Sequence, residues 1–364
     1  MAYIGIDLHS NRFTCNNDGN KNMTKTYPLV EEGMERFYKD IGKGDYVVLE
    51  ATTNSFEFYD RIRDRVKEVY IVNPNKIKMI SATSKKTDKV DALKLRKLLK
   101  YHVENDGEFL PTVYVPEKGI RELRTLYTSY KIYKKQITQM KNRIHSLLRQ
   151  SLNGSRYGKR EIGEKFMKDI RGDERVDKFY KEQVEILYES INMLEGQAEK
   201  IKEKIMWLGR KYQKDIDILT SVDGISVFVA LGIISDYGEI ERFRNAKKFA
   251  SYLRSVPRVD GSNDRVYIGK TKKDGRRLTI GLLLQSLYHV TKRDSLLRRF
   301  YIKKQKGKSR GKVRMAVVRK LLVAIYYMLK ERKYYRYMNK ENHQRKMREY
   351  ERFLEKYEKN LESS

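Results

Sequence analysis

The segments Tyr3-Ile4-Gly5-Ile6-Asp7 and Tyr46-Val47-Val48-Leu49-Glu50 are both apolar stretches that end on an acid. Short apolar runs bounded by polar residues predict buried β-strands. Residues 12–16 suit a hairpin partner for the first strand, and residues 68–72 predict a further strand. Helical patterns separate the later strands. This alternation after an initial hairpin predicts an α/β domain with a mixed sheet over residues 1–115.

The hydrophobic period changes from about residue 116. Two long stretches with apolar residues three and four positions apart predict a helical spacer over residues 116–212, either an antiparallel hairpin or a coiled coil that pairs two protomers. Glycines punctuate shorter helical patterns over residues 213–335, which predicts a mainly helical domain. Residues 336–364 predict a charged helical tail, solvated or dependent on a partner.

The charge of the chain is concentrated in its second part. The 364 residues include 79 Lys and Arg and 48 Asp and Glu, so 79 − 48 gives a net charge of +31. Residues 1–115 have 19 basic and 17 acidic side chains, a net of +2, which leaves 60 − 31 = +29 for residues 116–364. This asymmetry predicts that the second part binds a polyanion, although a general basic bias of composition would also produce it.

The composition also excludes several classes of protein. A single cysteine, Cys15, excludes a disulfide framework and a multi-cysteine zinc site, and is typical of a reducing cytoplasm. The longest clean apolar run, residues 321–329, is far shorter than the roughly 20 residues of a membrane span. We therefore expect a cytoplasmic protein with no membrane partner.

Four carboxylates are candidates for one site in the first domain. Asp7 and Glu50 end strands that would lie side by side if parallel, and Asp88 and Asp91 share one face of a predicted helix. Two carboxylates about 4 Å apart repel by roughly 4 kcal/mol at an effective dielectric of 20. Divalent cations relieve this repulsion, and oxygen ligands select Mg²⁺ or Mn²⁺. Alternatively, each acid is a helix cap or a surface charge.

Two residues near these acids in the sequence each have two alternative roles. His9 could reach the site, but a residue at a strand end is the simpler interpretation. Arg12 could contact a phosphate or only balance the acids.

A glycine-rich basic segment contains a candidate nucleophile. Ser262 lies in a predicted turn, and a serine hydroxyl needs a base, a metal or positive surroundings to react. The cations that would hold phosphate follow it: Arg265, Lys270, Lys272, Lys273, Arg276 and Arg277. Alternatively, Gly-Ser-Asn is an ordinary turn.

Taken together, these segments resemble the DEDD-type insertion-sequence transposases, relatives of the Piv-like DNA invertases. The resemblance covers roughly residues 1–335 and depends on the order of its blocks. The blocks are Ile4-Gly5-Ile6-Asp7, Val48-Leu49-Glu50-Ala51, Lys86-Thr87-Asp88-Lys89-Val90-Asp91-Ala92, residues 219–224, residues 247–253, Val256-Pro257, Ser262, residues 269–275 and residues 319–322. Asn263 departs from the family pattern, which has glycine after the serine.

The resemblance implies an RNase H-like (RuvC-type) domain, a coiled-coil spacer and a mainly helical transposase domain. It implies that Asp7, Glu50, Asp88 and Asp91 bind Mg²⁺, with Mn²⁺ as an alternative, and that Ser262 is the nucleophile of a serine recombinase. It also implies donor and target DNA, a structured bridge RNA and a homo-oligomer, dimer or tetramer, acting at the nucleoid. The alternatives are a RuvC-like metal nuclease, in which Ser262 is only a turn residue, and a non-catalytic nucleic-acid-binding remnant.

Overall fold

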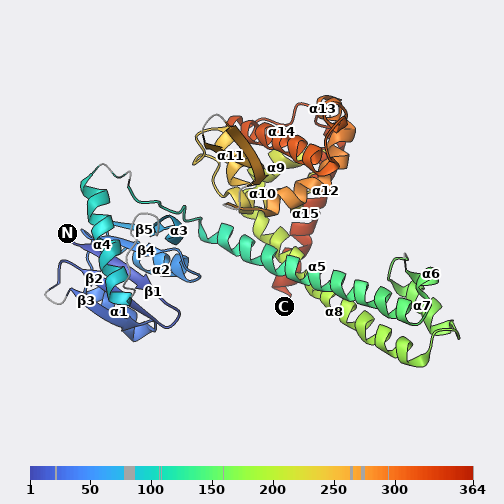
Figure 1. The fold of residues 1–364 in the computed structure, drawn as a ribbon, viewed down its shortest axis with the longest axis horizontal. Helices are drawn as coiled ribbons and strands as arrows, with labels where there is room; N and C mark the ends of the chain where they lie inside the picture. The colour runs from blue at the N-terminus through green and yellow to red at the C-terminus, as the bar shows by residue number, and fades with distance from the viewer. Residues whose placement is uncertain are drawn as a thin grey trace. The chain divides into compact units, whose positions relative to one another are not determined.

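The computed structural model describes residues 1–20, 23–77, 87–105, 107, 109–158, 160–262, 265–271, 275–293 and 295–363. These residues form two compact units, Met1–Val115 and Pro116–Ser364, each with its own core. Figure 1 shows the elements of both units.

The first unit is built on a mixed sheet, as predicted. Its strand order is β3-β2-β1-β4-β5. β1 pairs antiparallel with β2, and β2 with β3, whereas β1–β4 and β4–β5 are parallel. The strands are β1 (Tyr3–Leu8), β2 (Arg12–Asn17), β3 (Thr24–Pro28), β4 (Tyr46–Glu50) and β5 (Glu68–Val72). The sequence did not predict β3, an edge strand in which Tyr27 alone is buried, because it has too few apolar residues.

Helices cover both faces of this sheet. The helices are α1 (Glu31–Lys39), α2 (Ser55–Ile62), α3 (Pro74–Ile77) and α4 (Asp88–Glu104). Phe37 of α1 and Phe58 of α2 pack with Phe13 on one face. Leu95 and Leu99 of α4 pack on the other face, in a cluster with Tyr3 and Val48. This α/β architecture, with helices on both faces of a mixed five-stranded sheet, is consistent with an RNase H-like domain.

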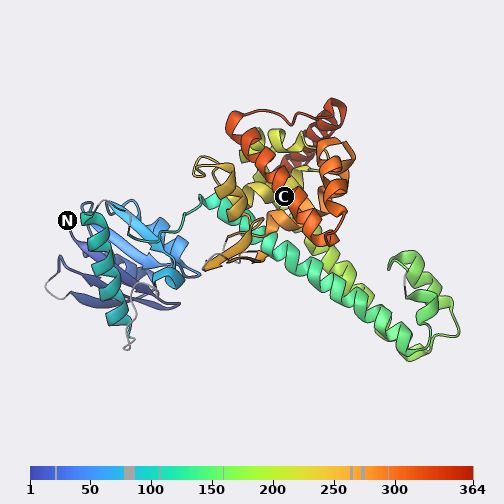
Figure 2. The same cartoon turned by 45° about the horizontal axis from the view of Figure 1, so that its top comes forward.

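The second unit contains two long antiparallel helices, as Figures 1 and 2 show. They are α5 (Lys118–Gln150) and α8 (Lys178–Leu208), and α6 (Gly154–Tyr157) and α7 (Glu164–Gly172) lie between them in the chain. The Lys141 Nζ atom lies 3.0 Å from Glu195 Oε1, so a charge near the helix seam is paired within the chain. Of the two alternatives, the structure contains the intrachain hairpin; pairing of protomers through these helices stays a prediction.

The base of this hairpin shares its core with the rest of the second unit. Ile120 and Leu123 of α5 and Ile205 of α8 pack in one cluster with Leu231 and Leu321. Residues 116–212, predicted as a spacer, therefore share a hydrophobic core with residues 213–335. The remaining elements are the 3₁₀ helix η1 (Gly209–Tyr212), α9 (Gln213–Thr220), α10 (Val227–Tyr237), α11 (Ala246–Tyr252), β6 (Pro257–Ser262), β7 (Arg265–Thr271), α12 (Leu278–Arg293), α13 (Ser295–Gln305) and α14 (Arg310–Glu331).

The charged tail is a helix, α15 (Lys340–Glu362), and it is not solvated throughout. Tyr350 is 2% exposed and His343 is 7% exposed, and both lie against other elements of the second unit. The Lys346 Nζ atom donates to the carbonyl oxygens of Thr220, Val222 and Ile225, which end α9 and form the following turn. One face of α15 is thus buried in the second unit, which the charged composition of the helix did not predict.

No helix among the described residues combines the length and the apolar character needed to cross a membrane.

Candidate active site

Strand pairing brings two of the predicted acids to neighbouring positions. β1 and β4 are parallel, and Ile6 is the register partner of Leu49, so Asp7 and Glu50 follow at the same edge of the sheet. Side chains alternate between faces along a strand, which puts Asp7 on the face of Tyr3 and Gly5, and Glu50 on the face of Val48. This is the face that α4 covers.

The first turn of α4 supplies the other two acids. The Thr87 side chain caps this helix by accepting a hydrogen bond from Val90 N at 3.3 Å. The helix approaches β1 closely at Gly5, where an added Cβ would lie 2.1 Å from the Ala92 carbonyl oxygen. The missing side chain of Gly5 is therefore what allows Asp88 to come within reach of Asp7.

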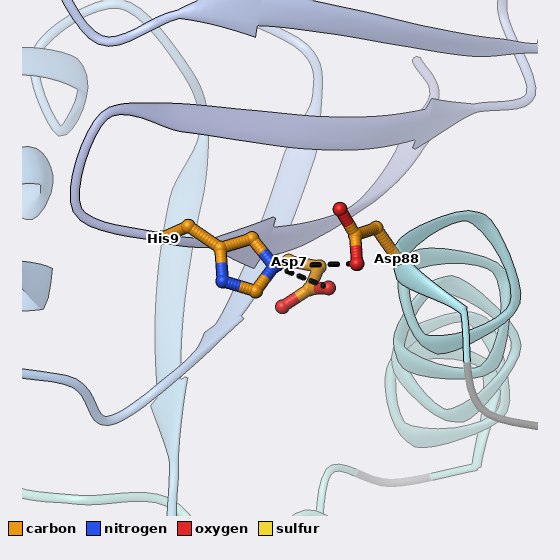
Figure 3. Close-up of side chains that lie close together, drawn as sticks. All are labelled: Asp7, His9 and Asp88. Carbon is orange, nitrogen blue, oxygen red and sulfur yellow. Dashed lines mark hydrogen bonds and ion pairs between the residues drawn. The ribbon is translucent and has the colours of Figure 1, made fainter.

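Asp7, His9 and Asp88 form a compact cluster, drawn in Figure 3. The His9 Nε2 atom lies 3.2 Å from Asp7 Oδ2 and 3.4 Å from Asp88 Oδ1. One ligand atom from each of the three residues falls within 4.8 Å of the others. Arg12 closes the cluster, because its guanidinium lies 3.2 Å from Asp88 Oδ2. This ion pair balances an acid, which is one of the two roles predicted for Arg12.

The four predicted acids do not all lie within the distance at which they could share one metal ion. Asp7 and Asp88 share the cluster, whereas Asp91 bonds to Lys94 Nζ at 3.1 Å. Glu50 ends the strand next to Asp7 and is not among the three residues that could share one ion. The structure thus concentrates the site on two of the four acids, with the other two at its margin.

The electrostatics of Asp7 fit a site prepared for a cation. Burial raises the pKa of Asp7 above its usual value, His9 opposes that rise, and Asp88 and Asp91 add to it. A carboxylate whose charge is disfavoured by burial and by like charges gains from a bound positive ion.

His9 is the site residue that the sequence reasoning set aside. Its side chain is 45% exposed. Its carbonyl oxygen accepts a hydrogen bond from Asn54 Nδ2 at 2.9 Å, so the loop after β4 holds the turn that carries His9. Its position in the sequence could have indicated this role. His9 follows Asp7 by two residues in the tight turn between β1 and β2, so its side chain lies at the same edge of the sheet as Asp7.

This donor set fits a divalent metal ion. Asp7 and Asp88 offer hard carboxylate oxygens, which suit Mg²⁺ and Mn²⁺. The imidazole of His9 is a softer donor, which moves the preference from Mg²⁺ towards Mn²⁺.

Ser262 is the last residue of β6, and its backbone pairs with Arg265, the first residue of β7. The structure thus places Ser262 at the end of a strand, where the sequence predicted a turn, and Asn263 lies outside the described residues. Arg265 and Lys270 belong to β7, whereas Lys272 and Lys273 lie outside the described residues.

The segment that leaves this hairpin is anchored by a buried acid. Asp236 at the end of α10 is fully buried and accepts hydrogen bonds from Thr279 N, Thr279 Oγ1 and Arg276 Nε at 2.8, 2.9 and 3.1 Å. Gly275 has φ +93°, and an added Cβ would meet the Tyr252 carbonyl oxygen at 2.1 Å. Arg276, predicted to bind nucleic acid, is thus engaged within the protein, whereas Arg277 is exposed.

Comparisons with known proteins cover both regions. A family model for the IS110 DEDD domain, described as "Transposase", matches residues 4–153, which contain the acid cluster. A second model, described as "Transposase IS116/IS110/IS902 family", matches residues 216–302, which contain Ser262. No curated protein matches the chain.

Proposed function

Because this chain carries both domains of the IS110-family transposases, enzymes of DNA transposition, we propose that it cuts and rejoins DNA strands through Ser262. In this proposal Asp7, Glu50, Asp88 and Asp91 bind Mg²⁺, or Mn²⁺ in its place. Donor and target DNA are the substrates, and a structured bridge RNA selects the sequences by base pairing.

The observation that carries the proposal is the Asp7–His9–Asp88 cluster. Its acids come from the end of β1 and the start of α4, and their mutual repulsion is relieved by cations. When bound, divalent ions would supply positive charge next to a scissile phosphodiester. Asp7 and Asp88 would hold such ions, and the turn fixed by Asn54 would keep His9 beside them.

The serine reaction explains how strands can be rejoined without an energy source. The Ser262 Oγ atom attacks the phosphorus, an Oγ–P bond forms, and the bond from phosphorus to one DNA oxygen breaks. The serine proton is released, and the departing oxygen becomes a hydroxyl. One phosphodiester replaces another, so attack by a DNA hydroxyl on the serine phosphodiester restores the strand. Attack by water would lose this bond and give a nuclease.

The charge of the second unit supports a nucleic-acid partner. Residues 116–364 have a net charge of +29, and neutralised phosphates provide most sequence-independent affinity. We propose that the protein works as a homo-oligomer, a dimer or tetramer, on DNA of the nucleoid.

The test is a denaturing-gel assay for protein–DNA adducts. The full chain is mixed with Mg²⁺, DNA from the ends of its element and RNA transcribed from the flanking noncoding region. Ser262→Ala and Asp7→Asn are compared with wild type. Ser309→Ala serves as control, because Ser309 precedes α14 and its side chain makes no capping bond.

We expect an adduct with wild type and Ser309→Ala and none with Ser262→Ala. Asp7→Asn should abolish both adduct and cleavage. Cleavage without an adduct, equal in Ser262→Ala, would reject the serine mechanism and identify a metal-dependent nuclease. No cleavage by wild type with all components present would identify a non-catalytic binding protein.

A further inference from the structure

The strongest local charge of the chain lies beyond the serine hairpin. Residues 292–320 contain 13 Lys and Arg and a single acid, Asp294, so 13 − 1 gives a net charge of +12 over 29 residues. They include α13 and the first half of α14. Lys303 of α13 is exposed, as are Lys306 and Lys308 in the connection between the two helices. A surface of this kind attracts phosphates at long range.

A cavity of about 220 Å³ opens among the three helices that carry or adjoin this charge. α12, α13 and α14 pack on one another, as Figure 1 shows. Each contributes to the lining, which includes Leu287, Tyr288 and Thr291 from α12, Tyr301 from α13, and Arg310 and Arg314 from α14. The cavity is smaller than the roughly 300–1,000 Å³ of pockets that enclose whole drug-sized ligands.

The lining combines an available aromatic ring with fixed polar groups. Tyr288 is 70% exposed, which is unusual for a large aromatic side chain, whereas Leu287 beside it is 4% exposed and belongs to the core. The Arg314 guanidinium donates to the Leu284 carbonyl oxygen at 2.6 Å, so its position is set. Thr291 Oγ1 donates to the Leu287 carbonyl oxygen at 2.9 Å and keeps lone pairs that can accept a bond.

These groups match the chemistry of one nucleotide. A base can stack on the exposed Tyr288 ring, and its amino or imino groups can donate to Thr291. Arg310 is exposed at the start of α14, where a guanidinium can pair with the adjoining phosphate. A duplex cannot use such a cavity, because its bases are paired and stacked.

We propose that the cavity between α12, α13 and α14 binds a single unpaired nucleotide of a DNA or RNA strand. The proposal rests on the proposed function, which supplies a nucleic acid as the partner. It adds that this cavity prefers unpaired to paired strands. The basic surface around it attracts any strand, and Tyr288 distinguishes those with a free base.

The test measures binding by the full chain with fluorescence anisotropy, without Mg²⁺ so that no cleavage occurs. The probes are a 25-nucleotide single strand and the matching duplex, each as DNA and as RNA. A second set carries 2-aminopurine, whose fluorescence falls when it stacks on an aromatic ring. Tyr288→Ala removes the ring, Tyr288→Phe keeps it, and Tyr327→Ala removes a comparable tyrosine of α14 that is 52% exposed and outside the cavity.

We expect Tyr288→Ala to bind the single strand about 10-fold or more weakly, since one base–aromatic stack contributes that much. Its affinity for duplex should stay within twofold of wild type, and its quenching of 2-aminopurine should be lost. Tyr288→Phe and Tyr327→Ala should behave as wild type. Selective loss with the DNA or the RNA strand supports the proposal and identifies which strand enters.

Equal affinity of Tyr288→Ala and wild type for single strands would overturn the inference. So would an equal loss for single strand and duplex, or no binding of any probe by wild type. Because these readouts require no strand cleavage, they are independent of whether Ser262 forms an adduct. Failure of the serine mechanism and failure of the nucleotide site are therefore distinguishable.

Discussion

At the scale of single residues, His9 changes the chemistry expected of the acid cluster. Its Nε2 atom adds a nitrogen donor to two carboxylates. Imidazole binds Mn²⁺ in preference to Mg²⁺, whereas carboxylates bind both. We expect His9→Ala to weaken Mn²⁺ binding more than Mg²⁺ binding, which titration calorimetry on both ions would measure. His289→Ala, an exposed histidine of the second unit, should change neither. An unchanged preference between the two ions would contradict a ligand role for His9.

Gly5 decides how closely two elements approach. A Cβ at this position would meet backbone atoms of α4, at 2.1 Å from Ala92 O and 2.4 Å from Arg96 N, so the whole helix would have to shift. We expect Gly5→Ala to lower the free energy of unfolding by about 1–3 kcal/mol, as overpacking does. Because Asp88 moves with α4, metal binding should weaken as well.

Gly196→Ala is the matched control, because nothing lies within 4 Å of the position that its Cβ would take in α8. This change should raise stability by about 0.5–1 kcal/mol, the usual effect of alanine for glycine inside a helix. Thermal unfolding of both variants would measure the contrast. Equal effects of the two changes would contradict the close approach of α4 and β1.

Lys346 couples the last helix to the stability of the second unit. Burial lowers the pKa of Lys346 from 10.5 to about 8. Between about pH 8 and 10.5 the unfolded chain therefore binds more protons than the folded one at this group, so its contribution to stability rises with pH across that window. We expect the melting temperature of wild type to rise relative to that of Lys346→Met as the pH increases from 7.5 to 10. A constant difference between the two proteins would show that Lys346 titrates normally.

At the scale of the whole molecule, the uneven charge predicts where nucleic acid binds. Each phosphate neutralised contributes about 0.9 to the slope of log K against log salt concentration for duplex DNA. We expect replacement of Lys303, Lys306 and Lys308 by Gln to reduce that slope by about 2 to 3. Anisotropy titrations at several salt concentrations would measure it.

Replacement of three exposed lysines of the near-neutral first unit, Lys39, Lys76 and Lys97, should leave the slope nearly unchanged. The same reduction with both triple variants would mean that attraction is spread over the chain rather than concentrated on α13, α14 and the connection between them.

Local patterns in the sequence determined much of this protein. Apolar runs ending at Asp7 and Glu50 predicted two buried strands, and spacings of three and four predicted the long helices α5 and α8. Burial imposes these patterns residue by residue, so they can be read without tertiary contacts. The ordered motif blocks predicted a transposase, and both family models agree.

Only the tertiary structure decided which side chains meet. His9 joins Asp7 and Asp88 because a tight turn and the bare Cα of Gly5 bring three segments together. The charged helix α15 packs on the rest of the second unit because a few of its residues, among them Tyr350 and Lys346, bond to partners far away in the chain. Contacts between distant segments leave no periodic trace in the sequence, so the place of His9 beside the two acids, the buried face of α15 and the cavity beside Tyr288 became visible only in the folded chain.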